Sequence, residues 1–143
     1  MNHSPSAIER FFHAFEKNTA SGDIAAQTAQ FADMFLAANP AGSQAVRNSD
    51  FALALPKRKR LFDKLGCTST TLESLRETAL DARYVLADTE WRMTFDLPGG
   101  SREEVIAGSV FIVDTGGDPF KILFYLAKLD IFAVLRARGI LRD

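Results

Sequence analysis

A small number of side chains in this sequence could do acid–base chemistry. Asp33 could act as a general base if burial raised the pKa of its carboxyl group, but it also fits an exposed or capping position. His13 could carry a proton near neutral pH, or could lie on the exposed flank of a helix. The two tyrosines, Tyr84 and Tyr125, could each donate a phenol hydrogen bond to a substrate carbonyl, or could pack in a protein contact. The remaining histidine, His3, lies close to the N-terminus.

Other reactive groups are scarce. The single cysteine, Cys67, can form neither an intramolecular disulfide nor a cysteine cluster for zinc, and no base lies near it in the sequence. The paired glycines at 99–100 and 116–117 fit hairpin turns better than a phosphate-binding loop. Because metal-ligand spacing is also missing, we expect no metal and no cofactor.

A basic run, Lys57 to Arg60, is the segment that could contact nucleic acid or serve as an import signal. The run follows Pro56 at an expected helix start, and apolar residues come directly after it. The 17 Lys and Arg residues of the chain are also balanced by 18 Asp and Glu residues, so bulk charge does not favour a polyanion. A solvated helix face is the better interpretation, and we expect no nucleic-acid partner.

The length and composition of the chain fit one domain that spans residues 1–143. The 143 residues are 47% hydrophobic, which is enough for one sizeable core. No apolar run approaches the ~18–20 residues that a membrane span needs, and residues 1–10 have no apolar signal core. We therefore expect a cytoplasmic protein with no membrane partner.

Helical periodicity dominates the first half of the sequence. Ser4 is a plausible N-cap with Pro5 at the first helical position, and the first helix is predicted from the apolar spacing of Ile8, Phe11, Phe12 and Phe15. A second helix is predicted from Ile24 through Phe31, Met34 and Phe35, ending at 39–42. In the ambiguous segment 43–55, residues 43–46 could form a short strand and residues 51–55 a strand or loop. A third helix is predicted over 57–65, opened by Pro56.

Alternation with a period of two residues dominates the second half. Strands are expected over about 67–80, 84–96, 102–113 and 120–128, separated by turns rich in glycine and proline. In the clearest strand, residues 85, 87, 89, 91, 93 and 95 form a dry face and the residues between them a wetter face. Asp130 is expected to cap a short closing helix that Gly139 ends. Helices followed by strands joined by hairpins predict an α+β domain.

This order of elements resembles the cone-shaped, cystatin-like α+β fold of the nuclear-transport-factor-2-like superfamily, in its SnoaL-like and ketosteroid-isomerase-like branch. The resemblance covers nearly the whole chain and is carried by four segments: the aromatic helix around residues 11–15, residues 31–35, the strand 84–95, and the strand 121–130. It implies N-terminal helices packed on a strongly curved antiparallel sheet, with a short C-terminal helix. It also implies a deep apolar pocket between the sheet and the helices, and a homodimer formed through the sheet.

The resemblance gives two alternative functions. In the first, the protein binds an apolar small molecule in the cone, where it could also run a cofactor-independent isomerisation, dehydration or cyclisation. Asp33 would then be the base and Tyr125 or His13 the donor. The pocket would be lined by six apolar side chains: Phe15, Phe31, Phe35, Trp91, Met93 and Phe111.

In the second, the cone is filled by phenylalanine side chains and the protein is a non-catalytic dimerisation or protein-interaction module whose sheet face contacts a partner. Its interface would then include Tyr84, Glu90 and Arg92 on the sheet. Glu90, Arg92 and Thr94 could instead hold a ligand carboxylate, or form cross-strand pairs. A cavity of ~300 Å³ or more with converging polar groups would favour the first function.

Overall fold

The computed structural model describes residues 5–142 and places short helices before a long-stranded sheet. The elements follow in the order α1 (Ala7–Ser21), α2 (Ile24–Ala29), β1 (Phe31–Asn39), β2 (Gly42–Arg47), α3 (Asn48–Lys64), β3 (Cys67–Ala79), β4 (Tyr84–Asp96), β5 (Arg102–Asp114), β6 (Lys121–Ala127) and α4 (Ile131–Ala137). The α+β class with a short C-terminal helix is therefore confirmed.

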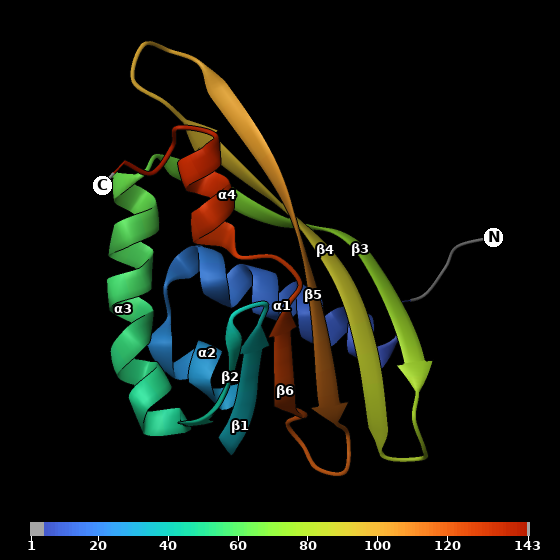
Figure 1. Cartoon of the computed structure of the whole chain (residues 1–143). Coiled ribbons are helices and arrows are strands. Elements are labelled where there is room, and N and C mark those ends of the chain that lie inside the picture. Colours follow the sequence, from blue (N-terminus) through green and yellow to red (C-terminus); the bar gives the residue numbers. More distant parts are fainter. Residues whose placement is uncertain (1–4, 143) are drawn as a thin grey trace, which may run out of the picture.

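One open, six-stranded sheet forms the body of the molecule, with the strand order β2-β1-β6-β5-β4-β3. Every neighbouring pair is antiparallel except β1 and β6, which run parallel, so the sheet is mixed rather than wholly antiparallel. Figure 1 shows long strands that curve, with α1 and α2 behind them and α3 along the side of the β1–β2 hairpin. The helices α1, α2 and α3 thus cover one face of the sheet, and within residues 5–142 no helix covers the other face.

The first helix begins later than its sequence suggests. Ser6 is its N-cap, and the Ser6 hydroxyl accepts a hydrogen bond from the Glu9 amide at 3.0 Å. Pro5 precedes the cap and is not the first helical residue. His3 and Ser4, the latter expected as the cap, lie outside the described residues.

Residues 31–39 form strand β1, and the prediction that they continue the second helix is wrong. The spacing of Phe31, Met34 and Phe35 imitates a helical stripe, but the segment pairs with β2 on one side and with β6 on the other. The pairing with β6 shifts register between Phe31 and Leu36, at an irregularity in the strand. Two neighbouring strands thus override a local pattern that a helix could also satisfy.

Helix α3 begins at Asn48, so residues 51–55 are helical and Pro56 lies inside the helix rather than at its start. The Asn48 carboxamide donates to the carbonyl oxygens of Thr28, Phe31 and Ala32 at 2.9, 3.1 and 3.2 Å, which fixes the start of α3 against β1. Phe51 packs on Phe31 with the ring centroids 4.6 Å apart. These tertiary contacts offset the backbone hydrogen bond that Pro56 cannot make. Of the alternatives left open for residues 43–46, the structure has the short strand, as part of β2.

The alternating face of β4 is confirmed. Ala87, Thr89, Trp91, Met93 and Phe95 are all buried, whereas the residues between them are half-buried or exposed. The closing helix is confirmed as well. The Asp130 carboxylate accepts from the Ala133 amide at 3.1 Å, and Leu135 of α4 is fully buried.

The core divides into two clusters along the sheet. One cluster centres on Phe12, which contacts Phe111 of β5 with centroids 4.9 Å apart. The other lies under α4 and contains Phe62, Met93, Phe95, Val105, Leu135 and Ile140. Trp91 belongs to the first cluster and Met93, two residues further along β4, to the second. Residues of both clusters line the cavity described below.

Candidate functional site: a cavity between the helices and the sheet

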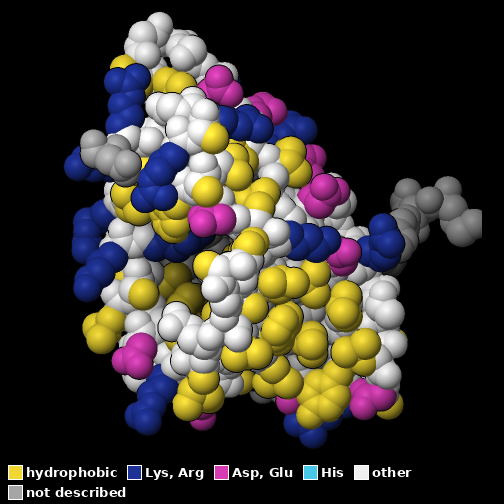
Figure 2. Space-filling model, in the orientation of Figure 1, with side chains coloured by type: hydrophobic (Ala, Val, Ile, Leu, Met, Phe, Trp, Pro, Cys, Tyr) yellow, Lys and Arg dark blue, Asp and Glu magenta, His cyan; other side chains and the backbone are white. Residues whose placement is uncertain are grey.

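A cavity of about 640 Å³ lies between the helices and the inner face of the sheet. Its walls come from every layer of the fold, since α1, α2 and α3 face β1 to β6 across it. Figure 2 shows the surface hollowed between α3 and the β1–β2 hairpin, with hydrophobic side chains in the wall. We call this space the main cavity.

The sequence predicts the apolar wall of the main cavity. It is lined by all six of the expected apolar residues: Phe15, Phe31, Phe35, Trp91, Met93 and Phe111. The strand register explains the position of Phe111. It lies opposite Tyr125 of β6, which in turn lies opposite Ala37 of β1, so the three residues share the face of the sheet that lines the cavity. The aromatic rings contact one another as well, and the ring centroid of Phe15 lies 5.5 Å from the ring centroids of both Trp91 and Phe111.

The Trp91 indole N–H is not free to contact a ligand. It donates to the Thr89 hydroxyl at 2.8 Å, and that hydroxyl donates in turn to the Ser109 carbonyl at 2.9 Å. Thr89 is fully buried, so this chain of hydrogen bonds satisfies a polar group on the dry face of β4. Trp91 therefore offers the cavity only its apolar ring.

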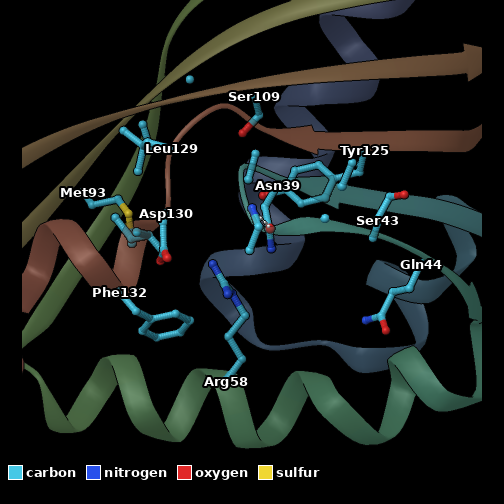
Figure 3. A pocket seen from close by; sticks show the side chains of 18 residues that line it. Asn39, Ser43, Gln44, Arg58, Met93, Ser109, Tyr125, Leu129, Asp130 and Phe132 are labelled. Carbon is cyan, nitrogen blue, oxygen red and sulfur yellow. Dashed lines mark hydrogen bonds between the residues drawn. The ribbon is translucent and has the colours of Figure 1, made fainter. Parts of the chain in front are cut away.

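A second hollow, of about 380 Å³, adjoins the main cavity on the side of the β1–β2 turn and α4. We call it the side pocket. Its polar groups include Asn39, Ser43, Asp130 and Ser109, and Figure 3 shows these with Arg58 rising from α3 among them. The two spaces share walls at Ala37, Gln44, Arg58, Met93, Ala107, Ser109 and Tyr125. An apolar chamber and a more polar one therefore meet at these residues.

The charged groups of the two spaces come mainly from α3. Lys59 and Asp63 line the main cavity and form an ion pair at 3.3 Å. Arg58 lines both spaces, and its guanidinium carbon lies 4.7 Å from the centroid of the Phe62 ring. Among the described residues, no hydrogen bond or ion pair is made to the Arg58 guanidinium.

Two of the three expected catalytic residues lie away from both spaces. Asp33 is exposed on β1 and lines neither of them, so burial does not prepare it to act as a base. His13 is exposed on α1 and lines neither of them. Tyr125 is half-buried and lines both. The structure thus brings Tyr125 to the apolar residues but separates it from its expected partners.

Cys67 lines the main cavity at the start of β3. Burial raises the pKa of its thiol, an effect that the hydrogen bond with Thr70 partly offsets. The raised pKa makes the thiol a weaker nucleophile at neutral pH than an exposed cysteine. Within residues 5–142, no group of three His, Cys, Asp or Glu side chains could hold a metal ion.

The contribution of α3 to the site was not predicted from the sequence. Phe51, Leu55, Arg58 and Phe62 line the main cavity from this helix, at spacings of four, three and four residues. That spacing is a helical stripe, but Pro56 in its middle favoured a helix start there instead. The apolar stripe around the proline was the signal that could have located these residues.

No helix formed by residues 5–142 packs on the outer face of the sheet. A row of apolar residues crosses this face over β1, β6, β5 and β4: Leu36, Phe124, Ile112 and Leu86. Each of the first three is the sequence neighbour of a residue that faces the main cavity: Ala37, Tyr125 and Phe111. With Val110 and Leu126 they form what we call the outer apolar patch, and Figure 2 shows hydrophobic side chains gathered over these strands. The patch is partly exposed, with Leu36 40% exposed.

Polar residues in the C-terminal half of β4 form cross-strand contacts on the same outer face. Arg92 lies within ion-pair distance of Glu73 on β3 and 3.6 Å from Glu104 on β5. Glu90 accepts a hydrogen bond from the Ser74 hydroxyl at 3.0 Å. These contacts agree with the cross-strand alternative for Glu90 and Arg92.

Over the described part of the chain, the helices are too short or too polar to span a bilayer.

Helices packed on one face of an open, curved, six-stranded sheet, with a cavity between the layers, define the NTF2-like α+β fold with cystatin-like architecture. The chain has this fold, as the resemblance in its sequence implies. No protein-family model matches the sequence, and no curated protein matches it.

Solved structures show the same fold at low sequence identity. An NTF2-like protein with a cystatin-like fold from Novosphingobium aromaticivorans superposes with a TM-score of 0.72 at 13% identity, over 96% of this chain and 88% of that one. Aln2 from a Streptomyces species gives 0.71 at 12% identity, over 96% and 100% of the two chains. The β subunit of benzoate 1,2-dioxygenase from Burkholderia mallei gives 0.69 at 12% identity, over 94% and 96%.

Proposed function

We propose that this protein binds an apolar small molecule in the main cavity. The observation that carries the proposal is an unfilled volume of about 640 Å³ beneath a sheet whose inner residues are aromatic and aliphatic. Small-molecule sites commonly enclose ~300–1,000 Å³, with mostly apolar walls and a few polar groups that fix orientation. The 12 phenylalanines of the chain could have filled the cone, but they leave this volume open, which counts against the filled-cone alternative.

Catalysis in the cavity would depend on Tyr125. It is the one expected catalytic residue that lines the space, and a phenol can donate a hydrogen bond to a substrate carbonyl as negative charge develops there. Similar structures include the subunit of a dioxygenase, so the fold occurs in enzyme assemblies. Isomerisation, dehydration or cyclisation without Asp33 and His13 would need another base, so binding is the function that the geometry supports best.

Cys67 makes the proposal testable, because the chain's single cysteine lines the main cavity. We expect decan-1-ol, 4-butylphenol or 2-naphthol to slow alkylation of Cys67 by N-ethylmaleimide, measured by intact-protein mass spectrometry at mildly alkaline pH. The pH matters because N-ethylmaleimide reacts with the thiolate, and the pKa of the Cys67 thiol is raised. Without ligand, the alkylation rate of Cys67 should therefore increase over a higher pH range than the alkylation rate of a solvent-exposed cysteine. Native mass spectrometry of the freshly purified protein would also show any molecule retained in the cavity.

Two substitutions to phenylalanine provide the control. Ala107 pairs with Trp91 and lines both spaces, so Ala107→Phe should fill the junction and weaken binding by about tenfold or more, which is about 1.4 kcal/mol. Ala79→Phe makes the same change at the exposed end of β3 and should leave binding unchanged. If none of the three alcohols protects Cys67 in the wild-type protein, the main cavity is not an apolar binding site.

We also propose that the protein forms a homodimer through the outer apolar patch. Four strands contribute large apolar side chains to one face that no helix of the described residues covers. Large contiguous apolar patches on a protein surface mark interaction sites. The interface would rest on these apolar residues rather than on Glu90 and Arg92, which already have partners on neighbouring strands. Tyr84 lies at the end of β4 next to the patch and would be at its edge.

Ile112→Lys should convert the dimer to monomers. The side chain lies in the middle of the outer apolar patch, between Leu86 and Phe124, and a lysine there would place a charge in the dimer interface. Sedimentation velocity measures the change. Thr94→Lys adds the same charge on the outer face of β4 beyond the patch and should remain dimeric. A monomeric wild-type protein would contradict the proposal.

A further inference from the structure

Arg58 is the side chain that the apolar cavity alone does not explain. It lines both the main cavity and the side pocket, at the walls the two spaces share. In Figure 3 it extends from α3 into the space between the β1–β2 turn and the residues at the start of α4. A guanidinium at the junction of an apolar chamber and a polar one is placed where the polar end of an amphipathic ligand would lie.

The guanidinium is held in position without using its hydrogen-bond donors. It lies over the Phe62 ring, with its central carbon 4.7 Å from the ring centroid, and Phe62 is itself buried in the core cluster under α4. Among the described residues, Arg58 donates no hydrogen bond and forms no ion pair. Its five N–H groups therefore face solvent in the free protein and are available to an acceptor.

The neighbouring charges leave Arg58 as the unpaired cation among the described residues of the site. Lys59 is engaged by Asp63 at 3.3 Å. Asp130 lines the side pocket, but one of its carboxylate oxygens already accepts from the Ala133 amide as the N-cap of α4. Asp50 lies in the first turn of α3, more than two helical turns from Arg58.

Neutral donors surround the same junction. The Tyr125 phenol, the Ser109 hydroxyl and the Gln44 carboxamide belong to residues that line both spaces. Arginine binds a carboxylate through two parallel hydrogen bonds, and nearby hydroxyl groups can donate to the remaining lone pairs.

We propose that the ligand of this cavity is an apolar monocarboxylic acid, with its carboxylate bound by Arg58 and its apolar body in the main cavity. The inference rests on the proposed function and specifies the substrate class of the same site. The apolar body would lie against Trp91, Phe15 and Phe111, and the head group at the wall shared with the side pocket.

Matched ligands that differ only in the head group test the proposal. Decanoic acid, 4-butylbenzoic acid and 2-naphthoic acid should protect Cys67 at lower concentrations than decan-1-ol, 4-butylphenol and 2-naphthol, each acid by about tenfold over its neutral analogue. Decylamine should bind more weakly than decanoic acid. Added salt should reduce the preference for the acids, because Arg58 is exposed in the free protein and its charge is screened.

Two arginines of one helix supply the matched variants. Arg58→Gln should remove the preference for acids, with roughly a tenfold loss of affinity for decanoic acid and no loss for decan-1-ol. Arg60→Gln makes the same change of charge on α3 at an exposed residue that lines neither space, and should leave both affinities within about twofold.

The outcomes separate this inference from the proposed function. If the alcohols and acids bind equally and Arg58→Gln changes neither, or if decylamine binds best, the cavity binds apolar molecules but the carboxylate inference is wrong. If no probe of any class protects Cys67, the proposed function itself is wrong. Circular dichroism of both variants should match that of the wild type, since neither side chain is buried.

Discussion

Gly66→Ala should destabilise the protein by more than about 3 kcal/mol. Gly66 joins α3 to β3 with a φ of +91°, a backbone conformation that costs a residue with a Cβ atom about 1–2 kcal/mol. A Cβ atom there would also overlap the backbone oxygen of Asp96, which cannot rotate away. The Asp96 amide donates to the Gly66 carbonyl at 2.8 Å, so relief of the clash must move the paired ends of β3 and β4. Urea denaturation measures the loss as a free energy of unfolding.

A second glycine separates the two causes of this loss. Gly99 has a φ of +92°, almost the same as Gly66, but a Cβ atom there would meet nothing within 4 Å. Gly99→Ala should therefore cost only the conformational part, about 1–2 kcal/mol. Gly117→Ala, with neither a left-handed φ nor a close neighbour, should change stability by about 0.5 kcal/mol or less. Equal losses at Gly66 and Gly99 would contradict the clash with Asp96.

Phe12→Ala should destabilise the protein by about 3–5 kcal/mol, the range typical of truncating a buried phenylalanine. Phe12 is fully buried on α1 and contacts Phe11, Phe15 and Phe111, with centroids 5.1, 5.9 and 4.9 Å away. Its removal would leave a void between α1 and the sheet, where neighbouring rings are held by their own contacts. A domain of this size is stable by only about 5–15 kcal/mol, so the substitution removes a large share of the total.

The loss of unfolding free energy should depend on how deeply the truncated side chain is buried, rather than on the number of apolar atoms removed. Leu53→Ala on α3 removes a side chain that is 71% exposed and should cost about 0.5 kcal/mol or less. Phe12→Leu retains most of the buried surface and should fall between the two. Thermal and urea denaturation of the three variants would compare them. A loss at Phe12 as small as that at Leu53 would mean that α1 does not anchor the sheet.

Much of the fold was predictable because the relevant signals are local. The alternation of β4 places Ala87, Thr89, Trp91, Met93 and Phe95 on one face, whatever the neighbouring strands are. The apolar stripe of α1 defines its buried face in the same way, and Asp130 caps α4 from three residues away. These local patterns place Phe15, Trp91 and Met93 on the inner wall of the main cavity, whereas Phe31 and Phe35 reach that wall from β1, which was predicted as helix.

The tertiary structure alone decided β1, α3 and the polar part of the site. Phe31, Met34 and Phe35 fit a helix or a strand, and pairing with β2 and β6 selects the strand. Pro56 suggests a helix start, but Asn48 and Phe51 anchor the chain against β1 and let α3 continue through the proline.

Those long-range contacts also determine which reactive groups meet. They leave Asp33 and His13 exposed and away from both spaces, and they bring Arg58 and Tyr125 to the walls that the spaces share. A residue's type and its local spacing fix which face of an element it occupies, whereas its partners depend on contacts across the fold. The local pattern of this sequence therefore determined the apolar faces that α1 and β4 present to the cavity, and only the packing of α3 against the sheet decided the charge that this cavity presents to a ligand.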